Sequence, residues 1–359
     1  MKLDKKILLF KKYFRAVQPE VSGRQIEIEI SELVSDLRKK GKWIFQQIRK
    51  KELISLIDLS ISKGSQYFPS SDETKSNKYV IGKEKVNKDQ GQTYRWFNGY
   101  YDNDGKRVEG LKDGRIRMTL TGQVFPLLSG LATNEETREV IKSVDRFLKD
   151  KKLKGYHLNT DFGLDHYLSF GRAFGFAYGT KENGAFFSHM TVMYAYALYK
   201  RGFVKEAYDV LQSIYRMCMD TQKSKIYPGV PEYFDSTGRG MYHYLTGSAS
   251  WLIFTQLTQV FGVRGQGGDL VLSPKLIKEE FDQKARAIVH CFFAGQRISV
   301  TYLNEKKLDY GEYQISSVTL NDQPVDFHRI SSGTVKIKKE ILEQSPSISS
   351  ALCLRAVLS

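Results

Sequence analysis

The spacing of the apolar residues changes near residue 262, and this change constrains the fold more than any other feature. Before it, apolar residues recur every three or four positions, as on the buried face of a helix. From Gly267 they alternate with polar residues, as in LVLSPKL, AIVHCFF, RISVTYLN and YQISSVTLN, which is typical of strands. Asn321-Asp322 suits a hairpin turn. We therefore predict a mainly α-helical part over residues 1–262 and a small β-domain over residues 263–359.

The helical part combines amphipathic helices with long connections. Ser31 is a candidate N-cap of the second predicted helix. The connections 155–184 and 222–244 are long, and long loops inside a domain usually build a functional site. Residues 62–93 are polar and read as an insertion or loop. The apolar spacing predicts helices over 5–17, 31–48, 122–132, 135–152, 190–201, 204–219 and 247–261.

The composition excludes several classes of protein. The hydrophobic content of 41% is that of a globular chain. The net charge is +15, but the basic runs fall on predicted helices, where a solvated face explains them better than a nucleic-acid site. The three cysteines, Cys218, Cys291 and Cys353, are too far apart for a disulfide framework or a zinc site. We expect a cytoplasmic protein with no membrane segment, nucleic-acid partner, metal or cofactor.

Three segments carry candidate chemistry. In TKENGAFFSH, Lys181 and Glu182 occupy a turn bounded by glycine, and His189 lies near the start of a helix. Unpaired backbone N–H groups at a helix start favour an anion. The alternative is a polar loop with a histidine that caps a helix.

The second and third segments extend this pattern. In YHYLTGSASW, small donors stand directly before an apolar helix, where they suit either an anion site or an ordinary N-cap. In YPGVPEYFDSTGRG, prolines and glycines fix a loop that offers the carboxylates of Glu232 and Asp235 to sugar hydroxyls. The alternative for this loop is a solvated surface turn.

Taken in order, these segments resemble glycoside hydrolase family 94, the inverting disaccharide and oligosaccharide phosphorylases. The resemblance extends to WFNGYYDNDGKRVEG and TGQVFPLLSGLA and spans residues 91–275. No single motif decides it, but five in the same order are specific. The wording of GYYDNDGKRVEG, NTDFG and IYPGVPEYFDS is most similar to the 1,2-β-oligoglucan phosphorylase branch, which is related to the C-terminal domain of cyclic β-1,2-glucan synthases.

The resemblance implies a fold and a reaction. The fold is an (α/α)6 barrel, of which this chain holds a part, followed by a small β-domain of the sandwich or jelly-roll kind. The reaction is reversible phosphorolysis of a β-glucooligosaccharide, which gives α-glucose 1-phosphate with inversion. Inorganic phosphate is then a co-substrate rather than a cofactor. One carboxylic acid must protonate the leaving oxygen, while phosphate takes the place of water in the inverting scheme.

The resemblance also assigns roles to residues of this sequence. His189 matches the phosphate-binding histidine, Thr246 and Gly247 match a phosphate-binding pair, and Ser248 follows them. Lys181 matches a lysine that holds the acceptor sugar. The other candidates for substrate contact are Glu182, Asn183, Glu232, Tyr233 and, with its role left open, Gln123.

The general acid of the family lies in an Asp-Trp-Asn/Asp segment that this sequence does not match. None of its tryptophans, Trp43, Trp96 and Trp251, follows an aspartate. The acid is therefore expected upstream of this chain, with Asp161 as a weak alternative. Three interpretations follow: a truncated, inactive product; one subunit of a split enzyme, whose N-terminal half is the partner; or a non-catalytic carbohydrate-binding remnant. Homodimers are usual in the family.

Overall fold

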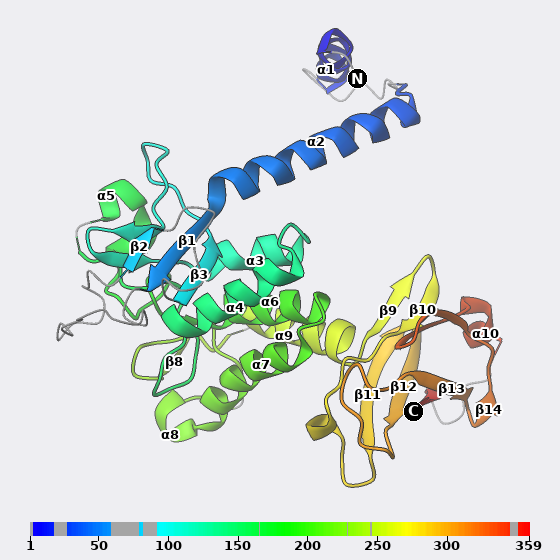
Figure 1. Ribbon diagram of the computed structural model, residues 1–359. Helices are drawn as coiled ribbons and strands as arrows, with labels where there is room; N and C mark the ends of the chain where they lie inside the picture. Colours follow the sequence, from blue (N-terminus) through cyan, green and yellow to red (C-terminus); the bar gives the residue numbers. More distant parts are fainter. Residues whose placement is uncertain are drawn as a thin grey trace. The chain divides into compact units, whose positions relative to one another are not determined.

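The computed structural model describes residues 3–17, 27–58, 79–81, 92–164, 166–227, 229–244, 246–344 and 351–359. The chain divides into two compact units, residues 1–53 and 54–359. Figure 1 follows the order of the elements along the chain.

The first unit contains two helices, α1 (Leu3–Val17) and α2 (Ile30–Glu52). Both were predicted from the apolar spacing. The predicted N-cap is wrong, because the helix begins one residue before Ser31 and its N-cap is Glu29, which has extended backbone. The Ser31 hydroxyl instead donates a hydrogen bond to the Glu29 carboxylate at 3.0 Å.

Helix α6 forms the centre of the helical part of the second unit. Its sequence is apolar on nearly every side, which is typical of a helix buried all round. It contacts α3, α7 and α9. The start of α6, where His189 lies, is thereby anchored in the core. The longer helices here are α3 (Thr121–Leu128), α4 (Asn134–Phe147), α6 (Ser188–Lys200), α7 (Val204–Met219) and α9 (Gly247–Thr255).

Three of the predicted helices end at least four residues earlier than expected, and the first of them, α3, ends at Leu128. Helix α4 ends at Phe147, because the Asp150 carboxylate accepts hydrogen bonds from the N–H groups of Lys152 and Leu153 and makes a turn there. Helix α9 ends at Thr255 and continues as the π-helical turn η4 (Gln256–Val260). Periodicity alone does not separate a π-turn from an α-helix.

The first three strands of the described chain are short, and only β2 lies wholly within the segment 62–93 that the sequence assigned to an insertion or loop. The strands β1 (Leu53–Asp58), β2 (Tyr79–Ile81) and β3 (Gln92–Phe97) form a sheet in the order β2-β1-β3. Most of the polar segment 62–93 lies outside the described residues. The buried end of β3 packs on α4, with the rings of Trp96 and Phe147 5.8 Å apart.

The stretches between the longer helices and strands of this unit contain small elements of their own. They include the pair β4 (Gly110–Lys112) and β5 (Arg115–Arg117), and the short helices α5 (Tyr167–Phe170), η3 (Arg172–Gly175) and α8 (Thr221–Ser224). A further sheet joins β6 (Phe186–Phe187), β7 (Tyr233–Phe234) and β8 (Gly240–Met241) in chain order. This sheet links segments that are far apart in the sequence.

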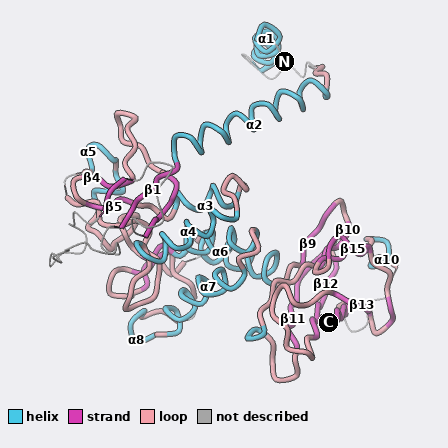
Figure 2. Tube along the Cα trace, in the orientation of Figure 1, coloured by secondary structure: helices cyan, strands magenta, loops and turns pink. Residues whose placement is uncertain are grey.

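The residues after 262 form the predicted β part, drawn as strands and loops in Figure 2. One sheet has the strand order β15-β16-β10-β9 and the other β11-β12-β17-β13-β14. Asn321 and Asp322 both have positive φ, at 51° and 64°, as a tight hairpin turn requires. The strands are β9 (Val263–Gln266), β10 (Asp269–Leu272), β11 (Arg286–Phe293), β12 (Gln296–Leu303), β13 (Ile315–Leu320), β14 (Gln323–Pro324), β15 (His328–Ser331), β16 (Thr334–Ile337) and β17 (Leu352–Leu358), with η5 (Lys278–Glu280) and α10 (Lys339–Glu343).

Hydrogen bonds tie the β part to the helices. The Lys275 ammonium donates to the carbonyl of Tyr199 at 2.6 Å and to the side chain of Gln259 at 2.8 Å. The Tyr302 hydroxyl donates to the carbonyl of Phe261 at 2.6 Å. Residues 54–359 are therefore one compact unit, although helices give way to strands where the sequence predicts a domain boundary.

Among the described residues, no helix combines the length and the apolar character needed to cross a membrane.

Candidate functional site

The three segments singled out in the sequence meet around one backbone carbonyl. The carbonyl of Glu232 accepts a hydrogen bond from the N–H of Ser188, the first residue of α6, at 2.9 Å. It also accepts one from the hydroxyl of Ser248, the second residue of α9, at 3.4 Å. The loop around residue 232 thus joins the starts of two helices.

His189 lies directly against the backbone of Gly247. A Cβ atom placed on Gly247 would be 2.6 Å from Cε1 and 2.7 Å from Nδ1 of the imidazole. Only glycine leaves room for this approach. Both residues lie in the first turn of a helix, where the backbone N–H groups lack intrahelical partners. The structure therefore brings together His189 and the Thr246-Gly247 pair, as the sequence predicts.

The imidazole of His189 has an unpaired nitrogen. Its Nε2 is buried and makes no hydrogen bond within the described part of the chain. Burial lowers the pKa of His189, and the nearby Glu232 carboxylate opposes that shift. A buried polar atom without a partner costs about 1–3 kcal/mol. Groups of this kind mark candidate ligand sites, and an oxyanion would supply an acceptor to a protonated imidazole.

Thr246 and Ser248 both serve the start of α9. Thr246 is the N-cap, and its hydroxyl oxygen accepts from the N–H of Ser248 at 3.3 Å. The structure therefore shows the ordinary N-cap, and the anion site at this helix start stays a prediction. The Thr246 hydroxyl keeps its own proton, which it can donate to a ligand. Ser248 is fully buried, so its side chain supports the loop.

The turn that carries Lys181 is held in an uncommon conformation. Lys181 has a φ of +48°, and Tyr242, in the adjoining segment, has a φ of +57°. Non-glycine residues rarely adopt positive φ. The Lys181 ammonium lies 4.7 Å from the centre of the Phe176 ring and 5.9 Å from that of Tyr242. The lysine is thus directed over aromatic faces.

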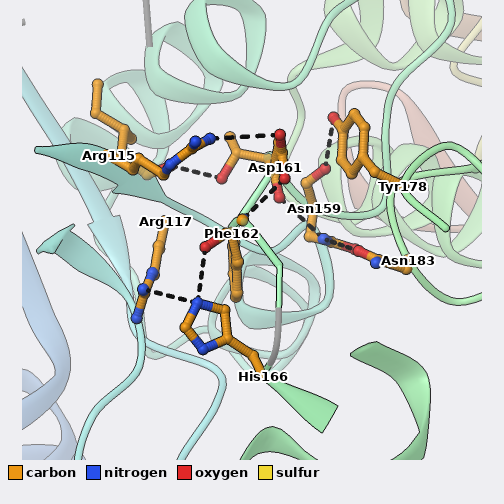
Figure 3. A network of polar contacts seen from close by, with 11 residues as sticks. Arg115, Arg117, Asn159, Asp161, Phe162, His166, Tyr178 and Asn183 are labelled. Atoms are coloured by element: carbon orange, nitrogen blue, oxygen red, sulfur yellow. Dashed lines mark hydrogen bonds and ion pairs between the residues drawn. The ribbon is translucent and has the colours of Figure 1, made fainter. Parts of the chain in front are cut away.

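Asn183 holds this turn in place through hydrogen bonds of its side chain. Its amide nitrogen donates to the carbonyl of Phe176 at 2.7 Å, and its amide oxygen accepts from Asn159 at 3.1 Å. The Asn159 amide oxygen accepts from the N–H of Gly184 at 2.8 Å, and its carbonyl accepts from the Tyr178 hydroxyl at 3.2 Å. Figure 3 shows Asn159 between Tyr178 and Asn183. Both asparagines are buried, so Asn183 positions the turn.

Glu182 and Tyr233 lie beside the same turn. One carboxylate oxygen of Glu182 pairs with Arg172 at 2.9 Å, while the other is buried without a partner among the described residues. Tyr233 is buried in β7 with its ring stacked on that of Phe187 at 6.1 Å. Burial raises the pKa of its phenol. These residues stay candidates for sugar contact.

Gln123 lies elsewhere in the fold. It is fully buried in α3, and its side chain bonds the backbone of β3. The amide oxygen accepts from the N–H of Phe97 at 2.9 Å, and the amide nitrogen donates to the carbonyls of Phe97 and Thr119, both at 2.9 Å. Every polar atom of this side chain is used, so the structure gives it a structural role rather than a substrate contact.

Asp161, the weak alternative for the acid, belongs to a basic cluster that the sequence did not reveal. Its carboxylate accepts from the N–H of Gly163 at 2.8 Å and pairs with Arg115 at 3.4 Å. Arg117 contacts Nε2 of His166 at 3.3 Å nearby (Figure 3). The only sequence signal for this cluster was the segment NTDFG.

Comparison with known proteins decides the family. The sequence model of the glycosyl hydrolase 94 superfamily, catalytic domain, matches residues 50–262. This range contains every candidate site residue and ends where the helices give way to strands.

The chain belongs to the glycosyl hydrolase 94 superfamily. Curated members of the superfamily match it at low identity. Cellobionic acid phosphorylase of Neurospora crassa is 25% identical over 194 residues, which are 48% of this chain and 23% of that protein. The 3-O-β-D-glucopyranosyl-β-D-glucuronide phosphorylase of Paenibacillus borealis is 25% identical over 196 residues, which are 50% of this chain and 24% of that protein.

The matched stretch therefore spans about a quarter of each curated relative. Both relatives carry names of glycoside phosphorylases, so the kind of enzyme in this part of the superfamily is clear. Their printed substrates differ from each other. Specificity does not transfer at this identity.

Proposed function

We propose that residues 180–251 form the phosphate- and sugar-binding part of a glycoside phosphorylase. The observation that carries this proposal is the unpaired, buried Nε2 of His189, held against Gly247 where two helix starts meet. Helix starts supply N–H donors and a positive dipole end, and imidazolium adds a charge-assisted donor. An inorganic phosphate is the ligand that this set of donors suits.

In the proposed reaction, a phosphate oxygen attacks the anomeric carbon of a β-glucoside. The bond from that carbon to the glycosidic oxygen breaks, and a bond to the phosphate oxygen forms on the opposite face. The product is α-glucose 1-phosphate, and the leaving oxygen takes a proton from a carboxylic acid. His189 and the first-turn N–H groups of α9 hold the phosphate, while Lys181 and Glu182 hold the acceptor sugar.

We further propose that the general acid comes from a segment outside residues 1–359, on the same polypeptide or on a partner half-enzyme. The absence of an Asp-Trp-Asn/Asp segment from residues 1–359 supports this, and the Asp161 carboxylate is already engaged by Arg115 and by the N–H of Gly163. The proposed substrate is a β-1,2-linked glucooligosaccharide, and the proposed architecture is part of an (α/α)6 barrel followed by a sandwich or jelly-roll-like β-domain. These finer points rest on the sequence motifs.

The direct test is phosphate binding, measured by calorimetry on the chain. We expect His189→Ala to lower phosphate affinity by about tenfold or more, because it removes a charge-assisted donor. The matched control is His328→Ala, an exposed histidine on β15. If both variants bind phosphate like the wild type, residues 180–251 do not form a phosphate site.

The test of phosphorylase activity supplies the general acid on a separate polypeptide. With a family segment that contains the Asp-Trp-Asn/Asp motif supplied, phosphate should release α-glucose 1-phosphate from β-1,2-glucooligosaccharides. A carbohydrate-binding module without catalysis is the competing function. It predicts sugar affinity that neither phosphate nor His189→Ala changes.

A further inference from the structure

A cavity lies where α7 begins and the β part approaches it. Its volume is about 280 Å³, and it is lined by residues 202–206, by residues 277–279 and by Asp309 and Tyr310. None of these residues belongs to the three segments of the phosphate and sugar site. Ligand pockets start at roughly 300 Å³, so this one suits a single small ring rather than a chain.

Several polar groups that line this cavity are free. The side chains of Lys205, Glu206 and Glu279 and the hydroxyl of Tyr310 make no hydrogen bond or ion pair within the described part of the chain. The first turn of α7 is also uncapped, since its N-cap Phe203 has no side-chain acceptor. Donors and acceptors therefore line the same hollow.

The charges of the cavity exclude two classes of ligand. Lys278 is paired with Asp309 at 3.6 Å, which leaves one lysine against the carboxylates of Glu206 and Glu279. This balance disfavours a phosphate or another anion. Over the described residues, no group of three or more His, Cys, Asp or Glu side chains is arranged to hold a metal ion.

Tyr310 adds an apolar face to these polar groups. Its side chain is 37% exposed, and its ring is braced edge-on by that of Tyr313 at 6.3 Å. An aromatic face beside mixed donors and acceptors matches a pyranose ring, which has an apolar C–H face and a rim of hydroxyls.

We propose that this cavity binds one pyranose unit of a neutral oligosaccharide, apart from the phosphate and sugar site. Carboxylates of Glu206 and Glu279 accept from sugar hydroxyls, Lys205 and the first-turn N–H groups of α7 donate to them, and Tyr310 covers one face of the ring. Such a site would keep a glucan chain attached to the protein. It is independent of phosphate.

The test measures binding of cellotriose and of β-1,2-linked glucotriose to the full chain by calorimetry without phosphate. The background carries Lys181→Ala and His189→Ala, so that the first site does not contribute. We expect Tyr310→Ala to weaken binding by about fivefold, the effect of losing one aromatic face. Glu206→Gln should weaken it by about threefold, because a neutral amide is the poorer acceptor.

Two controls keep the result interpretable. Tyr310→Phe retains the ring and should bind within about twofold of the background, which excludes misfolding as the cause. Tyr215→Ala removes an exposed tyrosine of α7 that does not line the cavity, and it should leave sugar binding unchanged. Bound sugar should also slow amide exchange at residues 202–206 and 277–279.

The proposal is overturned if the background shows no binding at about 10 mM sugar, where even weak recognition is measurable. It is equally overturned if Tyr310→Ala and Glu206→Gln bind as well as the background. Failure here leaves phosphate binding by His189 untouched. Conversely, if His189→Ala does not change phosphate affinity, the sugar-binding result at the cavity still stands.

Discussion

Two of the buried polar clusters in the described part of the chain differ in whether their side-chain atoms are paired. In the first, Gln123 and Glu109 bond the backbone and side chains around β3, and every polar atom of their side chains has a partner. In the second, around His189, the imidazole Nε2 and the hydroxyl of Ser188 are buried without partners among the described residues. Burial is common to both clusters. Pairing separates the side chains of Gln123 and Glu109 from that of His189, although Nε1 of Trp96 on β3 is also buried without a partner among the described residues.

The first prediction, with the largest expected effect on the free energy of unfolding, concerns the side chain of Gln123. Gln123→Ala deletes three hydrogen bonds and leaves the N–H and carbonyl of Phe97 unpaired inside the core. We expect the free energy of unfolding to fall by about 3–4 kcal/mol. Urea denaturation measures it.

The matched change in the second cluster is His189→Ala. It removes an atom that is already unpaired, so the loss should stay below about 1 kcal/mol. Equal losses in the two variants would mean that pairing does not separate the clusters.

The second prediction concerns the pH dependence of the first cluster. Burial raises the pKa of Glu109 to about 7, against hydrogen bonds from Gly99 and Thr119 that lower it. The carboxyl thus holds a proton in the folded state that it releases when unfolded at the same pH. The stability from this proton is full below the unfolded value of 4.5 and is lost as the pH rises through 7.

We expect the free energy of unfolding to fall by about 1–3 kcal/mol between pH 5 and pH 8. Glu109→Gln, which carries no titratable group, should flatten part of this slope. Burial also raises the pKa of Glu280 to about 7, so a residual slope is expected in that variant. A slope unchanged by Glu109→Gln would assign the effect elsewhere.

The third prediction tests the contact that shapes the second cluster. Gly247→Ala places a methyl group 2.6 Å from Cε1 of His189, so the imidazole must move. We expect a loss of about 1–3 kcal/mol in the free energy of unfolding, together with weaker phosphate binding. The matched control is Gly41→Ala in α2, where a Cβ meets nothing within 4 Å. That change should stabilise its helix by about 0.5–1 kcal/mol.

The two clusters also show which parts of the candidate site could be predicted from the sequence. The segments of the second cluster were predicted to form one site, because glycine-bounded turns and small residues before apolar helices carry a local signal. The joining contact, the Glu232 carbonyl, carried none, since any residue supplies a carbonyl. The two-residue strands β6, β7 and β8 are too short for periodicity to reveal.

Gln123 shows the limit of a motif. It was named as a candidate with its role left open, because a sequence does not tell whether an amide faces a cleft or a strand. In the β part, alternation predicted β10, β11, β12 and β13, and the Asn321-Asp322 turn predicted the hairpin after β13, because both signals are local. The other strands of this part were not predicted. The distant closure, in which β17 pairs in parallel with β12, was not predictable from spacing.

The last prediction sharpens the meaning of the unpaired nitrogen. Sulfate keeps one charge state between pH 5 and pH 8, so any change in its affinity reports on the protein. Burial lowers the pKa of His189 in the free chain, and a bound dianion would raise it. Sulfate affinity should therefore rise by about tenfold as the pH falls across this range, which equals one unit of pKa shift. In His189→Ala the profile should be flat, whereas an unaltered profile would place the titrating group, and hence the anion, away from the two helix starts.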